Sequence, residues 1–224
     1  MRVTDRTFVS DCDPAVHIID DDAGLRTSLD DLLRSAGFRV RQFGNAHEFA
    51  VSGRGSASGC LVLDVRLPGN TSGLDLQAQM RAMGSHMPMI FVTSRGDIRT
   101  AVRAMKAGAM DFFLKPFREQ DMLDAVAAAM ARDAEIRTLR AQIDELRERL
   151  GTLSERERAV MTLVVQGRMN KQIAIDLSIA EITVKIHRGN AMRKMRARTV
   201  ADLVRMAESV NAQSVTAARA PLIR

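Results

Sequence analysis

One short apolar run, Cys60 to Asp64 (CLVLD), constrains the fold of this chain more than any other feature. A short, continuous apolar run bounded by turn residues is typical of a strand that is buried on both faces, as in a parallel sheet. In open α/β sheets, ligands bind outside the carboxyl ends of the strands. Asp64 is therefore expected at a site of chemistry, although a single acid there could also simply begin a turn.

Apolar runs alternate with helical patterns through the first half of the chain. The first helical pattern has Leu25, Leu29, Leu32 and Leu33 on one face and ends before Gly37. Strands alternating with helices predict right-handed βαβ units, and so an α/β doubly wound parallel sheet of five strands. The predicted domain covers residues 15–128 and follows a loose arm at 1–14. Its strands are expected at 15–19, 38–43, 60–64, 89–93 and 112–115.

Cysteine usage and hydropathy limit the class of protein. The chain has two cysteines, Cys12 and Cys60, whose contexts give neither a disulfide framework nor metal-ligand spacing. No apolar stretch approaches the length of a membrane span, and the N-terminus lacks a secretory pattern. We therefore expect a cytoplasmic protein that makes no membrane contact.

Charge differs sharply between the two ends of the chain. Residues 1–121 contain 15 basic and 15 acidic residues, whereas residues 151–224 contain 13 basic and 6 acidic residues. A basic region of this kind favours contact with nucleic acid. The sequence therefore predicts that only the C-terminal part binds nucleic acid.

A linker helix is predicted at residues 129–151, where apolar residues recur at alternating three- and four-residue steps. This heptad seam spans only two heptads, fewer than a self-sufficient coiled coil requires. The helix could pair weakly with a second copy, or it could lie on its own N-terminal domain. The seam residues are Ile136, Leu139, Ile143, Leu146 and Leu150.

Reactive side chains follow four of the predicted strands. Asp20 and Asp21 end the first strand, Asp64 the third, Thr93 the fourth and Lys115 the fifth. Crowded carboxylates need a cation, and hard oxygen ligands with few protein contacts suit Mg²⁺. Such a site can accept a phosphoryl group on Asp64, with Lys115 and Thr93 holding the remaining oxygens.

This set of residues resembles the receiver domain of two-component response regulators. The match rests on Asp20-Asp21, Asp64, Thr93 and Lys115-Pro116 in this order. The resemblance implies a flavodoxin-like sheet of order 2-1-3-4-5, with Asp64 as phosphoacceptor and Asp20, Asp21, Asp64 and the carbonyl group of Arg66 as metal ligands. It also implies that Thr93, Phe112 and Pro116 form the switch, and that the Lys115-Pro116 bond is cis.

One feature departs from the receiver pattern. Pro68 and Gly73 enclose four residues, one more than is usual in the family. We expect the insertion to change the shape of this loop and to leave phosphorylation itself intact.

Residues 152–211 resemble the all-helical LuxR/FixJ-type helix-turn-helix DNA-binding domain. The matching stretches are 153–157, Gly167, 170–174 and 183–188, followed by a frayed tail at 212–224. The helix at 181–195 has Val184, Ala191 and Met195 on its inner face and suits a major groove. Lys185 and Ile186 are expected to contact base edges, and Lys171, Thr183 and Arg188 to hold phosphates. His187 is expected to pack against its own domain with its edge near a phosphate, and this interpretation is favoured over a specific contact with DNA.

Together the two resemblances imply a transcriptional regulator that a partner histidine kinase phosphorylates on Asp64. The phosphorylated chain is expected to pair as a homodimer on a double-stranded operator. An alternative is a DNA-binding regulator whose receiver acts as a phosphorylation-independent interaction module. A hydrolase of the haloacid-dehalogenase type is disfavoured because Arg66 stands where those enzymes carry their general acid.

Overall fold

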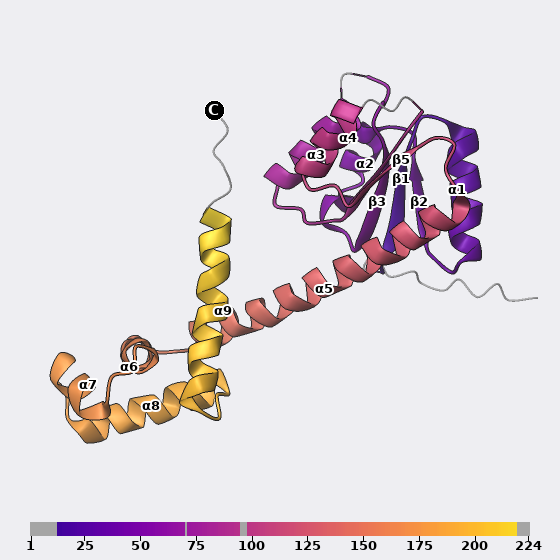
Figure 1. Ribbon diagram of the computed structural model, residues 1–224. Coiled ribbons are helices and arrows are strands. Elements are labelled where there is room, and N and C mark those ends of the chain that lie inside the picture. Colours follow the sequence, from indigo (N-terminus) through magenta and orange to yellow (C-terminus); the bar gives the residue numbers. More distant parts are fainter. Residues whose placement is uncertain (1–12, 70, 95–97, 219–224) are drawn as a thin grey trace, which may run out of the picture. The chain divides into compact units, whose positions relative to one another are not determined.

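The computed structural model describes residues 13–69, 71–94 and 98–218. The chain divides into two compact units, residues 1–137 and residues 138–224 (Figure 1). Most of the predicted N-terminal arm, including Cys12, lies outside the described residues. Within the described part, no helix is both long and apolar enough to cross a membrane.

The first unit contains a five-stranded parallel sheet in the order β2-β1-β3-β4-β5, which confirms the predicted doubly wound topology. Every residue of the central strand β3 is buried, as its continuous apolar run predicted. The strands are β1 (Ala15–Ile19), β2 (Val40–Phe43), β3 (Gly59–Asp64), β4 (Met89–Thr93) and β5 (Asp111–Leu114).

Helices cover both faces of this sheet (Figure 1). Helix α1 and the first part of α5 pack on one face through Leu29, Leu33 and Val126. Helices α2, α3 and α4 pack on the other through Phe49, Met80 and Ala104. Their bounds are α1 (Ala23–Ser35), α2 (Ala46–Val51), the 3-10 turn η1 (Arg54–Ser56), α3 (Gly73–Ala82), α4 (Ile98–Lys106) and α5 (Glu119–Gly151).

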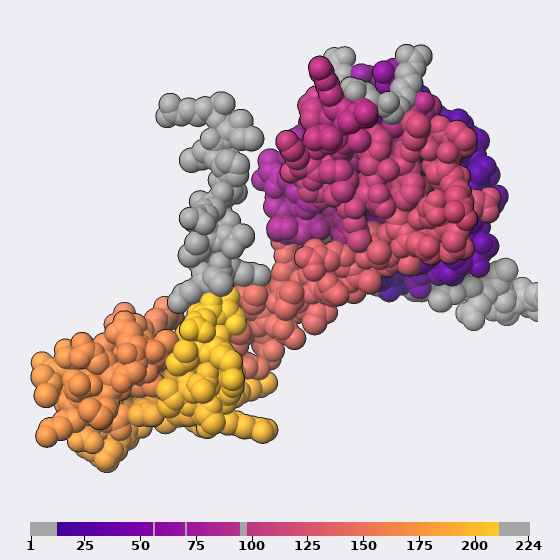
Figure 2. Space-filling view, in the orientation of Figure 1, coloured from indigo at the N-terminus to yellow at the C-terminus, as the bar shows by residue number. Residues whose placement is uncertain are grey.

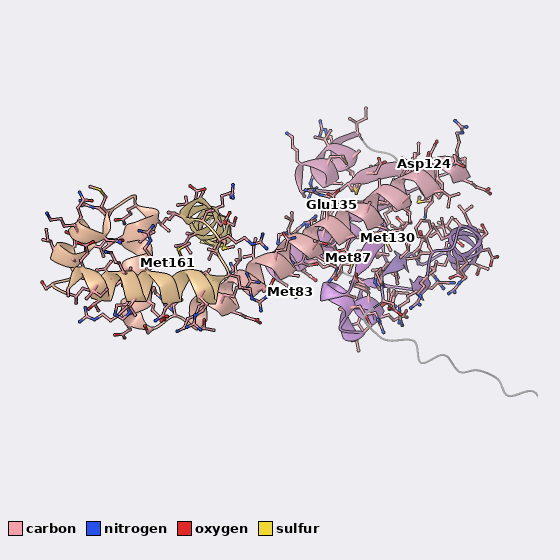
Figure 3. The ribbon with its side chains drawn as sticks, turned by 90° about the horizontal axis from the view of Figure 1, so that it is seen from below. Met83, Met87, Asp124, Met130, Glu135 and Met161 are labelled. Atoms are coloured by element: carbon pink, nitrogen blue, oxygen red, sulfur yellow. The ribbon has the colours of Figure 1, made fainter. Side chains whose placement is uncertain are left out.

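Methionine contributes to both cores beneath these helices, in a chain that has neither Trp nor Tyr. Met87 is buried in the core on the α2–α4 face, and Met130 packs partly buried against the other core (Figure 3). Met83, by contrast, is 73% exposed. The two cores of the first unit are thus mainly aliphatic, with methionine and phenylalanine among their buried residues.

Helix α5 contributes to both units, since the division falls between Arg137 and Thr138. Leu146 and Leu150 of the predicted seam are partly buried against the core of the second unit. Leu139, in contrast, is 55% exposed. The five seam residues therefore do not form one continuous free surface.

The second unit is helical, with α6 (Glu155–Val165), α7 (Asn170–Asp176), α8 (Glu181–Met195) and α9 (Val200–Ala218). Its core contains Val160, Met161 and Val164 of α6 together with Val184 and Met195 of α8. Figure 3 labels Met161, and Figure 2 shows the surface of this unit in orange to yellow. The frayed tail predicted at 212–224 is wrong for its first part, because α9 continues to Ala218, and residues 219–224 lie outside the described residues.

Candidate functional site

Three of the predicted side chains are joined at the carboxyl edge of the sheet. Asp20 follows β1, Asp64 ends β3 and Lys115 follows β5. The Nζ atom of Lys115 lies 2.6 Å from Oδ2 of Asp20 and 2.7 Å from Oδ2 of Asp64. Strand order explains the meeting of the two acids, because β1 and β3 are neighbours at the point where the direction of winding reverses. The long side chain of Lys115 reaches them from the end of β5, which β4 separates from β3.

Burial and ion pairing compete in setting the charges of this group. Asp20 is fully buried, and burial raises its pKa even though the hydrogen bond from Lys115 lowers it. Burial also acts to lower the pKa of Lys115, but hydrogen bonds to Asp20 and Asp64 outweigh it, so that the net shift is upward. The ammonium form of Lys115 is thus stabilised where it can hold a further anion.

The acidic residues offer a cluster of oxygen ligands. One carboxylate oxygen from each of Asp20, Asp21 and Asp64 lies within 4.8 Å of the others. The backbone N–H of Asp22 donates to Oδ1 of Asp20, and that of Arg66 donates to Oδ1 of Asp64, which fixes both carboxylates. Three hard, negatively charged ligands in this arrangement are typical of a Mg²⁺ site.

The predicted switch residues lie on β4, on β5 and just beyond β5. Thr93 is buried, and its carbonyl group accepts a hydrogen bond from the N–H of Lys115. Phe112 is half-buried, with its ring centroid 6.5 Å from that of Phe91. Thr93 and Phe91 are two residues apart on β4 and so share a face of the sheet. The bond between Lys115 and Pro116 is cis, as the resemblance implied.

The extra residue between Pro68 and Gly73 leaves Gly73 in direct contact with the strand that carries Asp64. The N–H of Gly73 donates to the carbonyl group of Val65 at 3.0 Å. A Cβ atom at Gly73 would lie 2.3 Å from the carbonyl oxygen of Asp64, so only glycine fits there. Asn70, one of the four residues between Pro68 and Gly73, lies outside the described residues.

One contact at this edge was not anticipated from the sequence. Arg26 on α1 donates a 2.6 Å hydrogen bond to the carbonyl group of Asp20. A basic residue six positions after an acid carries no distinctive signal. Only the packing of α1 beside β1 brings the two together.

The predicted DNA-contacting residues belong to α7 and α8. Lys171, Lys185 and Ile186 are exposed. The Nζ atom of Lys185 lies 3.4 Å from Oε1 of Glu181, which is one helical turn earlier. The inner face of α8 is buried through Val184, Ala191 and Met195, as predicted.

The remaining predicted contacts are only partly exposed. Thr183 and His187 are half-buried. Arg188 donates to Oδ1 of Asn170 at 2.9 Å and so connects α8 to α7. This bond gives Arg188 a structural role in addition to any contact with phosphate.

Two family models match the chain. Residues 16–127 match the response regulator receiver domain, and residues 151–207 match the luxR family of bacterial regulatory proteins. The chain is 52% identical to Nodulation protein W of Bradyrhizobium diazoefficiens, over 87% of this chain and 86% of that protein. It is 45% identical to the response regulator protein TodT of Pseudomonas putida, over 89% of this chain and 88% of that protein.

A solved structure supports the same assignment. The low-resolution structure of the response regulator StyR matches with a TM-score of 0.79 and 47% identity, covering 87% of this chain and 98% of that one. The transcriptional regulatory protein FixJ of Azorhizobium caulinodans is 45% identical over 86% of this chain and 90% of that protein. The chain therefore belongs to the two-component response regulators, as a transcriptional regulator in which a receiver domain precedes a LuxR-family DNA-binding domain.

Proposed function

We propose that Asp64 accepts a phosphoryl group from a partner histidine kinase, and that this modification controls binding of the C-terminal domain to double-stranded operator DNA. The observation that carries the proposal is the position of the Lys115 ammonium group between Asp20 and Asp64. A cation held there can bind a phosphoryl oxygen once Asp64 has reacted. A carboxylate oxygen of Asp64 forms the new P–O bond as the bond from phosphorus to the kinase imidazole breaks.

The metal ligands of this site are proposed to be Asp20, Asp21, Asp64 and the backbone carbonyl group of Arg66. A bound Mg²⁺ would neutralise the charge on the phosphoryl oxygens. The chain itself holds Asp64 in place through the N–H of Arg66 and keeps Lys115 charged beside it.

A groove beside Asp22 and Lys115 is suited to the kinase. It has a volume of about 490 Å³, and α1 lines one side of it with Leu25, Leu29 and Leu32. Phe117 adds an apolar side chain from the segment that follows β5. A helix of the partner placed there would bring its phosphohistidine to the same edge of the sheet as Asp64.

The response to phosphorylation is proposed to pass through Thr93 and Phe112 to the surface of α4 and β5. That surface exposes apolar side chains, with Ile98 82%, Val102 45% and Leu114 52% exposed. Atoms of this part of the chain, coloured magenta, lie on the face of the first unit seen in Figure 2. Exposed apolar surface of this kind favours pairing of phosphorylated chains as a homodimer, which would present two DNA-binding domains to two half-sites.

To test this proposal, the whole chain and its Asp64→Asn variant are each incubated with Mg²⁺ and acetyl phosphate, and their phosphorylation is compared. Intact-protein mass spectrometry should find one phosphoryl adduct on the wild type and none on the variant. DNA binding by each sample is then measured on the same duplexes. An unlabelled wild-type protein would remove Asp64 as phosphoacceptor. Equal DNA binding with and without the phosphoryl group would favour a receiver that acts as a phosphorylation-independent interaction module.

A further inference from the structure

Two large apolar side chains, Ile182 and Ile186, lie on the outward face of helix α8. Ile182 is 63% exposed and Ile186 is 56% exposed, although both are large and apolar. With about 100° of rotation per residue, both lie roughly opposite the buried side chain of Val184. The pair therefore forms an apolar ridge directed away from the core of its own domain.

Exposed lysines and a glycine lie on the same two helices, α7 and α8. Lys185 lies between the two isoleucines in sequence and is exposed, and Lys171 on α7 is exposed as well. Gly189, one turn beyond Lys185, has open space where a Cβ atom would stand. A polyanion is the partner that such charges favour, and the missing side chain at Gly189 allows close approach of the helix backbone.

In a DNA major groove, the apolar feature of a base pair is the 5-methyl group of thymine. We propose that Ile182 and Ile186 contact the 5-methyl groups of two thymines in each operator half-site, and so act as specificity-determining residues. This inference rests on the proposed DNA-binding function. The two side chains are separated by about 6 Å along the helix axis. Since stacked bases are about 3.4 Å apart, the two thymines should be one or two base steps apart.

The test begins by selecting binding sites from a randomised duplex library, using the full-length protein after treatment with acetyl phosphate. Each thymine of the selected half-site is then replaced by deoxyuridine, which removes only the methyl group. Replacement at either of the two contacted positions should lower affinity about fourfold, the effect of exposing one buried methyl group. Thymines elsewhere in the site should tolerate the replacement.

Protein variants assign each methyl group to its partner. With Ile186→Ala, the deoxyuridine penalty should fall below about 1.5-fold at one of the two positions and persist at the other, and Ile182→Ala should show the reverse. Ile175→Ala is the matched control, because Ile175 is 72% exposed but lies on α7. That variant should keep both penalties.

The possible failures are distinct from one another. If no sequence is selected and binding to duplex DNA is not salt-dependent, the proposed function itself is wrong, and this inference falls with it. If binding is salt-dependent but selects no sequence, if a site is selected but deoxyuridine has no effect, or if the penalties persist in both isoleucine variants, DNA binding stands and the thymine contacts are refuted.

Discussion

The carboxylate of Asp133 on α5 accepts a 2.8 Å hydrogen bond from the N–H of Gly59, the first residue of the strand that ends in Asp64. Oδ2 of Asp133 also accepts from the hydroxyl of Ser58 and from Nε of Arg137. Arg137 in turn donates to the carbonyl group of Ala57. The helix that leads out of the receiver is thus bound to the amino end of the strand that carries the proposed phosphoacceptor.

Removal of the Asp133 carboxylate should destabilise the first unit. Asp133 is 4% exposed, so Asp133→Ala leaves the Gly59 N–H without its acceptor and should cost about 2–3 kcal/mol in free energy of unfolding. Asp133→Asn keeps an acceptor oxygen and should cost about half of that. Glu135→Ala is the control, because its ion pair with Arg132 on the same helix is exposed (Figure 3). Urea denaturation followed by circular dichroism measures all three, and a loss for Glu135→Ala equal to that for Asp133→Ala would contradict this assignment.

The receiver should lose stability as the pH falls, through the buried His17. Burial, with smaller contributions from the charges of Arg54 and Arg41, lowers the pKa of His17 from 6.5 to about 4. The unfolded chain therefore takes up a proton between pH 6.5 and pH 4 while the folded chain does not. Stability is fully present above pH 6.5 and decreases toward pH 4, by up to about 3 kcal/mol.

Replacement of His17 should remove this dependence. His17 packs against the rings of Phe43 and Phe49, so His17→Phe should flatten the loss of stability between pH 6.5 and pH 4. His47→Phe should keep the loss, because His47 is exposed. Thermal unfolding followed by circular dichroism at several pH values provides the comparison. An unchanged pH profile in His17→Phe would mean that other groups titrate in this range.

Local sequence patterns predicted the sheet and the acidic edge well, for a physical reason. A strand buried on both faces must be continuously apolar, and the acids must stand where such strands end, so Asp20 and Asp64 are visible in the sequence itself. Contacts across long stretches of sequence leave no such pattern. The hydrogen bonds from Gly59 to Asp133 and from Arg26 to Asp20 depend on which surfaces meet in three dimensions.

The heptad seam is a second case in which the sequence pattern does not show which surfaces meet. Its spacing predicted an apolar stripe on α5, which is correct, but spacing does not identify the surface that covers the stripe. The core of the second unit covers Leu146 and Leu150, while Leu139 is 55% exposed. The apolar stripe is therefore partly buried against the second unit and partly exposed to solvent.

Leu139→Asp should weaken phosphorylation-dependent dimers without unfolding the chain, since its side chain is largely exposed. Ala141→Asp, which adds the same charge on the opposite side of the helix, should leave the dimers intact. Leu146→Ala should instead lower the free energy of unfolding of the second unit by about 1–2 kcal/mol, because it opens a partly buried site. Sedimentation velocity with and without acetyl phosphate measures the dimer. Equal dimerisation of Leu139→Asp and wild type would leave the α4–β5 surface as the remaining candidate interface.

Lys171 and Lys185 should affect DNA binding in different ways. Lys171 is exposed on α7, so Lys171→Ala should weaken binding to all duplexes alike and lower the salt slope of log K by about one. Lys185 lies on the outward side of α8 beside Glu181, and Lys185→Ala should cost about 1–3 kcal/mol mainly on the selected operator. Arg188 makes a poor probe of phosphate contact, because its bond to Asn170 means that Arg188→Ala also loosens α7 from α8. Fluorescence anisotropy titrations of operator and random duplexes at several salt concentrations separate these effects. If Lys185→Ala weakened binding to random and operator DNA equally, Lys185 would be a phosphate contact and base recognition would depend on the rest of the helix.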